Sequence, residues 1–129
     1  MTQLHNPVAY FEIPVHDMAR AVEFYANVFG YTFDIDTIDN YEMALFPWQA
    51  AHPGITGALV KGDVYKATNN GIILYFHTND IAYTLQCAID NGAKVLYPIT
   101  VNEQYGFAVA EFEDTEGNRI ALRQVFNEA

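Results

Sequence analysis

The sequence predicts an α+β fold of two tandem βαβββ modules, with a cavity between two curved sheets. Two observations lead to this prediction. A β-rich stretch at residues 8–15 is followed by a helical pattern that ends at Gly30, and the same order recurs from residue 72 to Gly92. Each helical pattern is then followed by three further strand candidates. Because one helix covers only one face of its sheet, two such units are expected to pair.

The two predicted helices have capping residues and apolar stripes. Asp17 is suited to cap the first helix and Gly30 to end it. The apolar stripe of this helix is Met18, Ala21, Val22, Tyr25, Val28 and Phe29. Asn79 or Asp80 is suited to cap the second helix and Gly92 to end it, and the stripe there is Ala82, Leu85, Ala88 and Ile89.

The strand candidates complete a single domain, residues 1–129, with module one at about 6–66 and module two at about 70–127. In module one the candidates after the helix are residues 32–38, 41–46 and 56–60. In module two they are residues 94–97, 107–112 and 119–125.

Aligning Asp17 with Asp80 brings the two opening strands into register. Side chains alternate along a strand, so one set of positions faces the helix and the other faces the cavity. The helix-facing set is nearly all apolar: Phe11, Ile13, Val15, Leu74, Phe76 and Thr78. The cavity-facing set is chemically mixed: Tyr10, Glu12, Pro14, Ile73, Tyr75 and His77. In the last strand the same alternation puts Ala121 on the cavity side, together with Arg119 and Arg123.

Composition and charge limit the class of protein. A length of 129 residues, 51% of them hydrophobic, suits one domain with a core of its own. Sixteen acidic against six basic residues give a net charge of −10, which disfavours nucleic acids and anionic membranes as partners. No apolar run approaches the roughly 20 residues that cross a bilayer. Because residues 1–7 also lack a signal-peptide pattern, a cytoplasmic location is expected.

Two further counts exclude types of chemistry. The single cysteine, Cys87, cannot form a disulfide within the chain, and two-cysteine metal or redox motifs are excluded. The sequence contains no serine, so a serine nucleophile is excluded as well.

Four stretches together resemble the vicinal oxygen chelate superfamily, the group of the glyoxalases, bleomycin resistance proteins and extradiol dioxygenases. They are YFEIPVHDMARAVEFYANVFGY (10–31), GALVKG (57–62), LYFHTNDIAYTLQCAIDNGAKVLYP (74–98) and YGFAVAEFEDTEGNRIALRQ (105–124). In their order they cover nearly the whole chain. The resemblance implies the same fold as the strand and helix patterns, but this superfamily supports many reactions, so the fold alone does not define the function.

The resemblance also implies four metal-ligand positions, one on the opening strand and one on the last strand of each module. The enzymes of the superfamily place His, Gln or Glu there, which suit divalent metals. Here the positions fall on Tyr10, Ile73, Ala121 and a residue of YEMALFPW, where Glu42, Met43 and Ala44 are alternatives. We therefore expect no standard metal site and no other cofactor, although a displaced metal site built on Glu12 and His77 is an alternative.

The expected function is the binding of a small organic molecule in the cavity. Glu12 and His77 are the candidate catalytic acid and base, and the candidate ligand-binding residues are Tyr10, Ile73, Tyr75, Ala121, Arg123 and Trp48. Trp48 either lines the pocket or fills a gap between the modules, and Arg119 and Arg123 either bind an anionic ligand or pair with an acidic side chain.

Two other functions compete with this one. The first is a drug- or metabolite-sequestering protein of the bleomycin-resistance kind, which the acidic charge and nine tyrosines favour. The second is a metal-dependent lyase, isomerase or dioxygenase with a shifted ligand set. A homodimer is expected in each case, and the acidic side chains at the last turn are expected to face water: Glu111, Glu113, Asp114 and Glu116.

Overall fold

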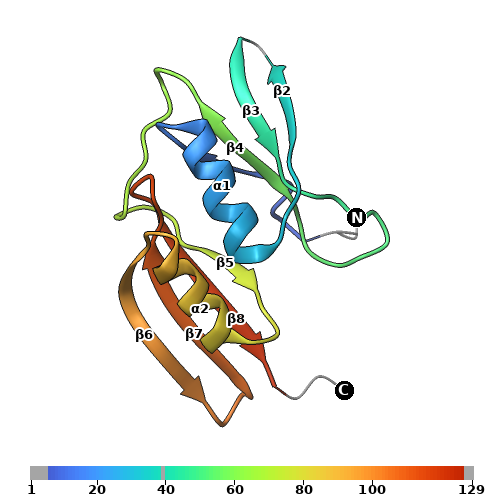
Figure 1. Ribbon diagram of the computed structural model, residues 1–129. Coiled ribbons are helices and arrows are strands. Elements are labelled where there is room, and N and C mark those ends of the chain that lie inside the picture. Colours follow the sequence, from blue (N-terminus) through green and yellow to red (C-terminus); the bar gives the residue numbers. More distant parts are fainter. Residues whose placement is uncertain (1–5, 39, 127–129) are drawn as a thin grey trace.

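The computed structural model describes residues 6–38 and 40–126 and contains two four-stranded sheets with one helix each (Figure 1). Module one consists of β1 (Phe11–Pro14), α1 (Met18–Phe29), β2 (Asp34–Ile38), β3 (Tyr41–Leu45) and β4 (Gly57–Lys61). Module two consists of β5 (Leu74–His77), α2 (Ile81–Asp90), β6 (Lys94–Asn102), β7 (Phe107–Glu113) and β8 (Arg119–Val125). Residue 127, the predicted end of module two, and both ends of the predicted domain lie outside the described residues.

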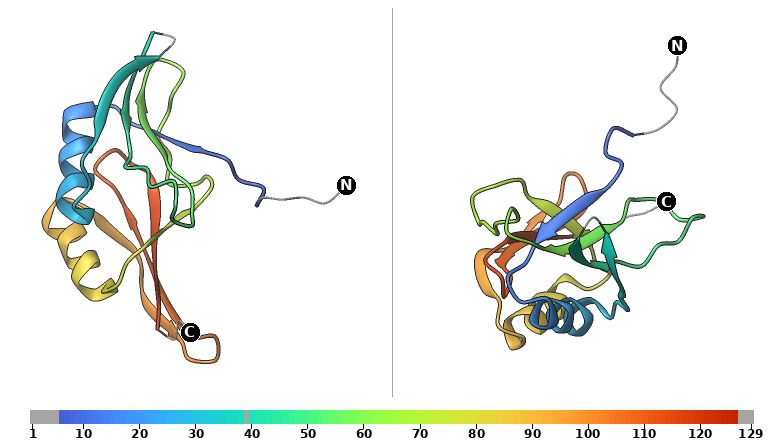
Figure 2. Two further views of the ribbon diagram at one scale, coloured as in Figure 1. Left: turned by 90° about the vertical axis from the view of Figure 1, so that its right-hand side faces the viewer. Right: turned by 90° about the horizontal axis from the view of Figure 1, so that it is seen from above.

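The two sheets share one topology, which confirms the prediction of two tandem βαβββ modules. The strand orders are β1-β4-β3-β2 and β5-β8-β7-β6. In each sheet the opening strand pairs in parallel with the last strand, and the other pairs are antiparallel. Both helices lie on the same side of the molecule and contact each other, so the opposite sheet faces look away from them (Figure 2). We call those the open faces.

Local capping explains where the helices begin and end. The Asp17 side chain accepts a hydrogen bond from the Arg20 N–H at 3.0 Å, and the Asp80 side chain accepts one from the Tyr83 N–H at 3.1 Å. Asp80 is therefore the cap of α2, not Asn79. Gly30 ends α1 with φ at 76°, a left-handed conformation that favours glycine. Within the described residues, neither helix is long and apolar enough to cross a membrane.

One apolar core joins the two modules. The helix-facing residues of the opening strands belong to it as predicted: Ile13 and Val15 are buried, and Phe11, Leu74 and Phe76 pack against them. The rings of Phe11 and Phe76 meet edge-on across the module boundary, with centroids 6.0 Å apart. Burial of these side chains therefore stabilises both modules at once.

The turn between β7 and β8 fastens module two to the start of α1. The Glu116 carboxylate accepts hydrogen bonds from the backbone N–H groups of His16 and Asp17, each at 2.8 Å, and from Arg20 Nε at 2.6 Å. Burial acts to raise the pKa of Glu116, but the hydrogen bond from Arg20 and those from the two N–H groups lower it to about 2.

Asp114 completes this turn from inside the core. Its carboxylate accepts a hydrogen bond from the Tyr25 hydroxyl at 2.7 Å, and burial raises its pKa. Asp114 and Glu116 are only 4% and 5% exposed and Glu111 is 9% exposed, so the expectation that these three face water is wrong. Asp114 also accepts hydrogen bonds from the N–H groups of Glu116 and Asn118 within the turn. The distant partners of the Asp114 and Glu116 carboxylates, His16, Asp17, Arg20 and Tyr25, lie 89 to 100 residues earlier, and no local pattern in the sequence reveals them.

Candidate functional site

Strand pairing defines which residues lie side by side on the open faces. Glu12 pairs with Ala58 in module one, and Tyr75 pairs with Ala121 in module two. Paired residues point to the same face of a sheet. Because Glu12 and Tyr75 occupy equivalent positions of the opening strands, Ala58 is the counterpart of Ala121.

This pairing corrects the fourth metal-ligand position. The last strand of module one is β4, not the YEMALFPW segment, which forms the preceding strand β3. Glu42 pairs with Lys61 and shares the helix side of the sheet with the core residue Ala44. Met43 lies on the open face, against Ala58 and Val60.

The four positions are therefore occupied by Tyr10, Ala58, Ile73 and Ala121. A phenol and three alkyl side chains do not fit a divalent metal, which takes imidazole and carboxylate ligands. Among residues 6–38 and 40–126, no group of three or more His, Cys, Asp or Glu side chains is placed to hold a metal ion.

A groove of about 440 Å³ lies at the boundary between the modules, and we call it the inter-module groove. Its walls come from β1, from the connection that enters β5, and from the start of β8. Most of the lining is apolar, and its charged side chains are Glu12, Lys66 and Arg119. Arg119 Nε donates a hydrogen bond to Glu111 Oε1 at 2.6 Å, so this cation is paired.

A smaller pocket of about 250 Å³ adjoins the groove on the open face of module one. We call it the tyrosine pocket, and its lining is Tyr10, Glu12, Ile38, Tyr41, Met43 and Tyr65. Tyr10 and Glu12 line both hollows. Neither Tyr41 nor Tyr65 is among the site residues predicted from the sequence. The alternation of Tyr41, Met43 and Leu45 along β3 could have indicated that Tyr41 lies on the open face. No local pattern in the sequence indicates the position of Tyr65.

Glu12 lies between two phenols in this pocket. The Tyr10 hydroxyl donates to Glu12 Oε2 and the Tyr65 hydroxyl donates to Glu12 Oε1, each at 3.1 Å. Burial and the Glu12 carboxylate raise the pKa of Tyr10 to about 12, so its phenol keeps its proton at neutral pH. The carboxylate is thus held in place by two phenol hydroxyl donors.

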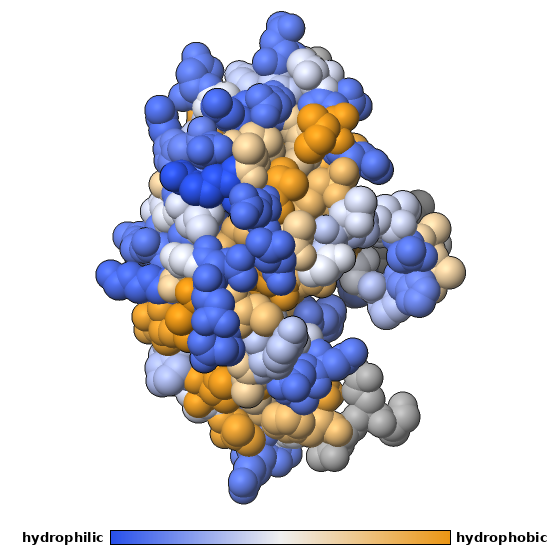
Figure 3. Space-filling model, viewed as in Figure 1, coloured by the Kyte–Doolittle hydropathy of each residue, from blue (hydrophilic) through white to orange (hydrophobic). Residues whose placement is uncertain are grey.

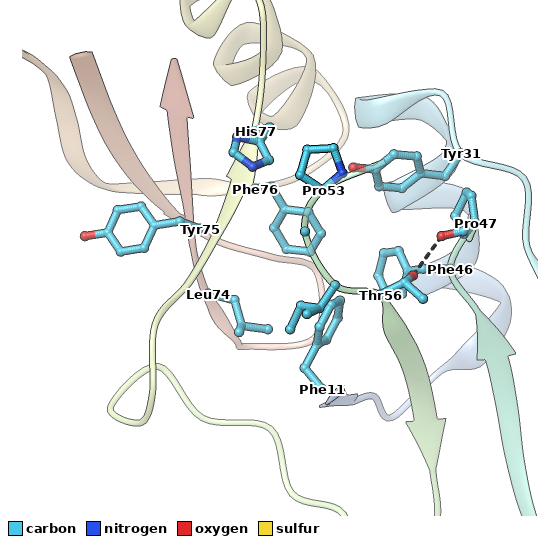
Figure 4. A pocket seen from close by; sticks show the side chains of 12 residues that line it. Phe11, Tyr31, Phe46, Pro47, Pro53, Thr56, Leu74, Tyr75, Phe76 and His77 are labelled. Carbon is cyan, nitrogen blue, oxygen red and sulfur yellow. Dashed lines mark hydrogen bonds between the residues drawn. The ribbon is translucent and has the colours of Figure 1, made fainter. Parts of the chain in front are cut away.

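A third hollow, of about 310 Å³, lies between β5 and the connection at residues 47–56 (Figure 4). The rings of Phe11, Phe46 and Phe76 form its floor, whereas the ring of Tyr75 points away from them (Figure 4). His77 and Tyr31 lie at its upper rim (Figure 4). Burial raises the pKa of the Tyr31 phenol.

The structure separates the two candidate catalytic residues. Glu12 lines the inter-module groove and the tyrosine pocket, and His77 lines the third hollow together with Tyr75. None of these three hollows contains both. Proton transfer by the pair would need both side chains within hydrogen-bond reach of one ligand.

The other predicted ligand-binding residues lie outside the three hollows. Ala121 is fully buried between its strand partners, and Ile73 is half-buried. The guanidinium carbon of Arg123 lies 5.0 Å from the centroid of the Phe107 ring. Trp48 is 60% exposed on the connection after β3. Of the predicted set, the structure brings Tyr10 and Glu12 together in one site and Tyr75 and His77 together in another.

Comparisons with known proteins agree with this fold. The family model described as "Bleomycin resistance protein-like N-terminal" matches residues 8–47. A "Glyoxylase-like domain-containing protein" from Didymella fabae is 29% identical over 122 residues, which is 92% of this chain and 94% of that protein.

Solved structures show the same architecture. A glyoxalase family protein from Bacillus cereus superposes with a TM-score of 0.74 at 15% identity, covering 98% of this chain and 100% of that one. TnmS3, an antibiotic binding protein from Streptomyces sp. CB03234, has a TM-score of 0.66 at 21% identity, covering 96% and 99% of the two chains. The chain spans about half, 46%, of glyoxalase I from Zea mays. The matched family model, the glyoxylase-like relative and the shared fold support the resemblance of this chain to the vicinal oxygen chelate superfamily.

Proposed function

We propose that this protein binds a small organic molecule in the inter-module groove, without a metal at the superfamily's standard positions. The observation that carries the proposal is the groove itself, a hollow of about 440 Å³ with a mainly apolar lining and a few charged groups. Hollows of roughly 300–1,000 Å³ with this kind of lining are typical of small-molecule sites. The alkyl side chains at three of the four ligand positions support metal-free binding.

Sequestration is the form of binding that we favour over catalysis. Glu12 and His77 line different hollows, so the groove does not bring the two predicted catalytic residues together. The antibiotic binding protein TnmS3, which shares this fold, supports the same choice. We therefore infer that the protein binds its ligand without converting it. The apolar part of the ligand would lie along β1 and the start of β8.

Binding in the groove can be tested with Nile red, a neutral dye that becomes fluorescent in apolar surroundings. Ile72 lines the groove and is 90% exposed, so Ile72→Asp places a charge there without disturbing the core. We expect dye affinity to fall about tenfold or more. Val64→Asp is the matched control, because Val64 is also exposed on the same connection but does not line the groove. Equal effects of the two variants, or no dye binding at all, would contradict the proposal.

We also propose that the protein works as a homodimer. The edge strand β6 exposes Val95, Tyr97, Ile99 and Val101, and apolar surface is visible at the module-two end of the molecule (Figure 3). Exposed apolar edge strands are normally covered, because they otherwise aggregate. Sedimentation analysis of the wild-type protein is expected to give about twice the chain mass of 14.5 kDa. The double variant Tyr97→Lys, Val101→Lys is expected to sediment as a monomer, with the mass of one chain. A wild-type chain at the single mass would refute this proposal.

A further inference from the structure

The geometry points to the tyrosine pocket as a site for an organic cation, a substituted ammonium group held against Glu12, Tyr41 and Tyr65. The inference rests on the proposed function and deepens it, because the tyrosine pocket shares Tyr10 and Glu12 with the inter-module groove. A ligand whose apolar body lies in the groove would place its charged end in this pocket.

The Glu12 carboxylate is oriented by hydrogen bonds but can still accept more of them. Each oxygen of Glu12 accepts one hydrogen bond from a tyrosine hydroxyl, at 3.1 Å in both cases. An ionised carboxylate has about four lone-pair sites, so both oxygens keep acceptor capacity for an N–H donor. The two phenols fix the position of the negative charge at the pocket wall, which is the requirement for a preformed cation site.

Two aromatic rings stand at right angles beside this charge. The Tyr41 and Tyr65 rings have centroids 5.2 Å apart and an interplanar angle of 85°. The negative face of an aromatic ring attracts a cation within about 6 Å of its centroid, and walls of this kind recognise quaternary ammonium groups. The thioether of Met43 and the side chain of Ile38 complete an apolar, polarizable lining.

Gly62 is needed for this arrangement. A Cβ atom at position 62 would lie 2.2 Å from Cδ1 of Tyr41 and 3.3 Å from Cδ2 of Tyr65. Both rings therefore pack close to bare backbone at the turn after β4, and the Tyr65 N–H donates to the Gly62 carbonyl at 3.1 Å in that turn. The turn delivers Tyr65 to Glu12, 53 residues earlier in the chain.

The charge of the pocket selects against other ligands. No Lys, Arg or His side chain is among the described residues that line it, and Glu12 would repel an anion. The net charge of −10 attracts cations to the whole surface and raises their local concentration. A volume of about 250 Å³ admits a trimethylammonium group with a short chain, but not a large ring system.

Methionine-methyl NMR tests the inference at the site itself, with choline and its uncharged carbon isostere, 3,3-dimethylbutan-1-ol, as probes. Met43 lines the pocket, whereas Met18 is buried on α1 on the other side of the sheet and serves as an internal control. We expect choline to shift the Met43 methyl signal and leave that of Met18 in place, with an affinity about tenfold higher than that of the isostere.

Variants separate the charge from the rings. Glu12→Gln is expected to lower the affinity for choline about tenfold and to leave the affinity for the isostere unchanged. Glu42→Gln is the matched control, because Glu42 lies on the helix side of the same sheet and is expected to change affinity less than about twofold. Tyr41→Leu removes one ring and is expected to lower the affinity for choline about threefold to tenfold.

Three results would overturn the inference: equal affinities for choline and the isostere, equal effects of the two Glu→Gln variants, or no Met43 shift at about 100 mM choline, where a millimolar site would be saturated. The choline and Nile red experiments test the two proposals separately. Nile red binding that is sensitive to Ile72→Asp, without choline binding, would support the inter-module groove as a binding site and contradict the cation site. Choline binding without Nile red binding would support the cation site and contradict ligand binding in the groove.

Discussion

Replacing Glu116 with alanine is expected to lower the free energy of unfolding by about 3 kcal/mol. The change leaves the N–H groups of His16 and Asp17 without their acceptor and removes the ion-pair partner of Arg20. Each donor left unpaired in these part-buried hydrogen bonds costs about 1 kcal/mol or more, and the half-exposed side chain of Arg20 limits the loss from the ion pair. Urea denaturation measures the loss, which corresponds to a melting temperature roughly 10 °C lower.

Glu103→Ala is the control for this substitution. Glu103 is exposed at the turn between β6 and β7, so its loss is expected to change stability by less than about 0.5 kcal/mol. A destabilisation by Glu116→Ala no larger than that of the control would show that the turn does not fasten the start of α1.

The pH dependence isolates the charge of Glu116. Its pKa is about 2 in the folded protein, against an ordinary value of 4.5. A lowered pKa stabilises the folded state above the ordinary value, and this stabilisation is lost as the pH falls through the folded value. The difference in unfolding free energy between wild type and Glu116→Gln is therefore expected at full size above about pH 5 and to shrink towards pH 2. A constant difference over this range would contradict the assignment.

The titration of Asp114 does not obscure the pH dependence of the stability difference between wild type and Glu116→Gln. Burial raises its pKa, so its contribution to stability runs in the opposite direction and is lost as the pH rises. Since Asp114 is present in both proteins, its contribution largely cancels in the difference.

Gly57→Ala is expected to cost about 3 kcal/mol or more, because β1 and β4 approach too closely for a side chain. A Cβ at position 57 would lie 2.0 Å from the Phe11 carbonyl oxygen and 2.8 Å from Cδ1 of the Phe11 ring. Phe11 and Gly57 are paired in the parallel ladder, so β1 would have to move away from β4. That movement displaces Glu12, and choline affinity is expected to fall with stability.

Gly71→Ala is the matched control for this prediction. A Cβ there would meet only the methyl group of Thr68, at 3.1 Å, and a side-chain methyl can shift more easily than a backbone carbonyl. Denaturation of both variants should show a small change for Gly71→Ala and a large one for Gly57→Ala. Similar stability of the two variants would mean that the strands can separate without cost.

The sequence predicted those parts of the fold that depend on periodicity. Alternation along the opening strands placed Ile13 and Phe76 on the helix side, and the aspartate caps located both helix starts. The strand β6 is longer than the predicted residues 94–97 and runs through Pro98. The strand continues to Asn102 because it lies at a sheet edge, where irregular pairing around Tyr97 accommodates a residue without an N–H group.

The candidate site was less predictable, because its contacts join distant segments. Tyr10 and Glu12 followed from strand alternation, but Tyr65 reaches Glu12 only through the turn that begins at Gly62. The separation of Glu12 from His77 depends on how the two modules pack, and periodicity within each module carries no information about that packing.

The hydrogen bonds of Glu116 give the two repeats unequal roles during synthesis. The start of α2 is completed within its own module, since the Ile81 N–H donates to Gln124 at 2.9 Å. The chain entering α1 instead depends on Glu116, about a hundred residues later. A ribosome releases module one first, but that module cannot complete its native contacts until nearly the whole chain has emerged. The half made first is therefore expected to complete its folding only together with the half made second.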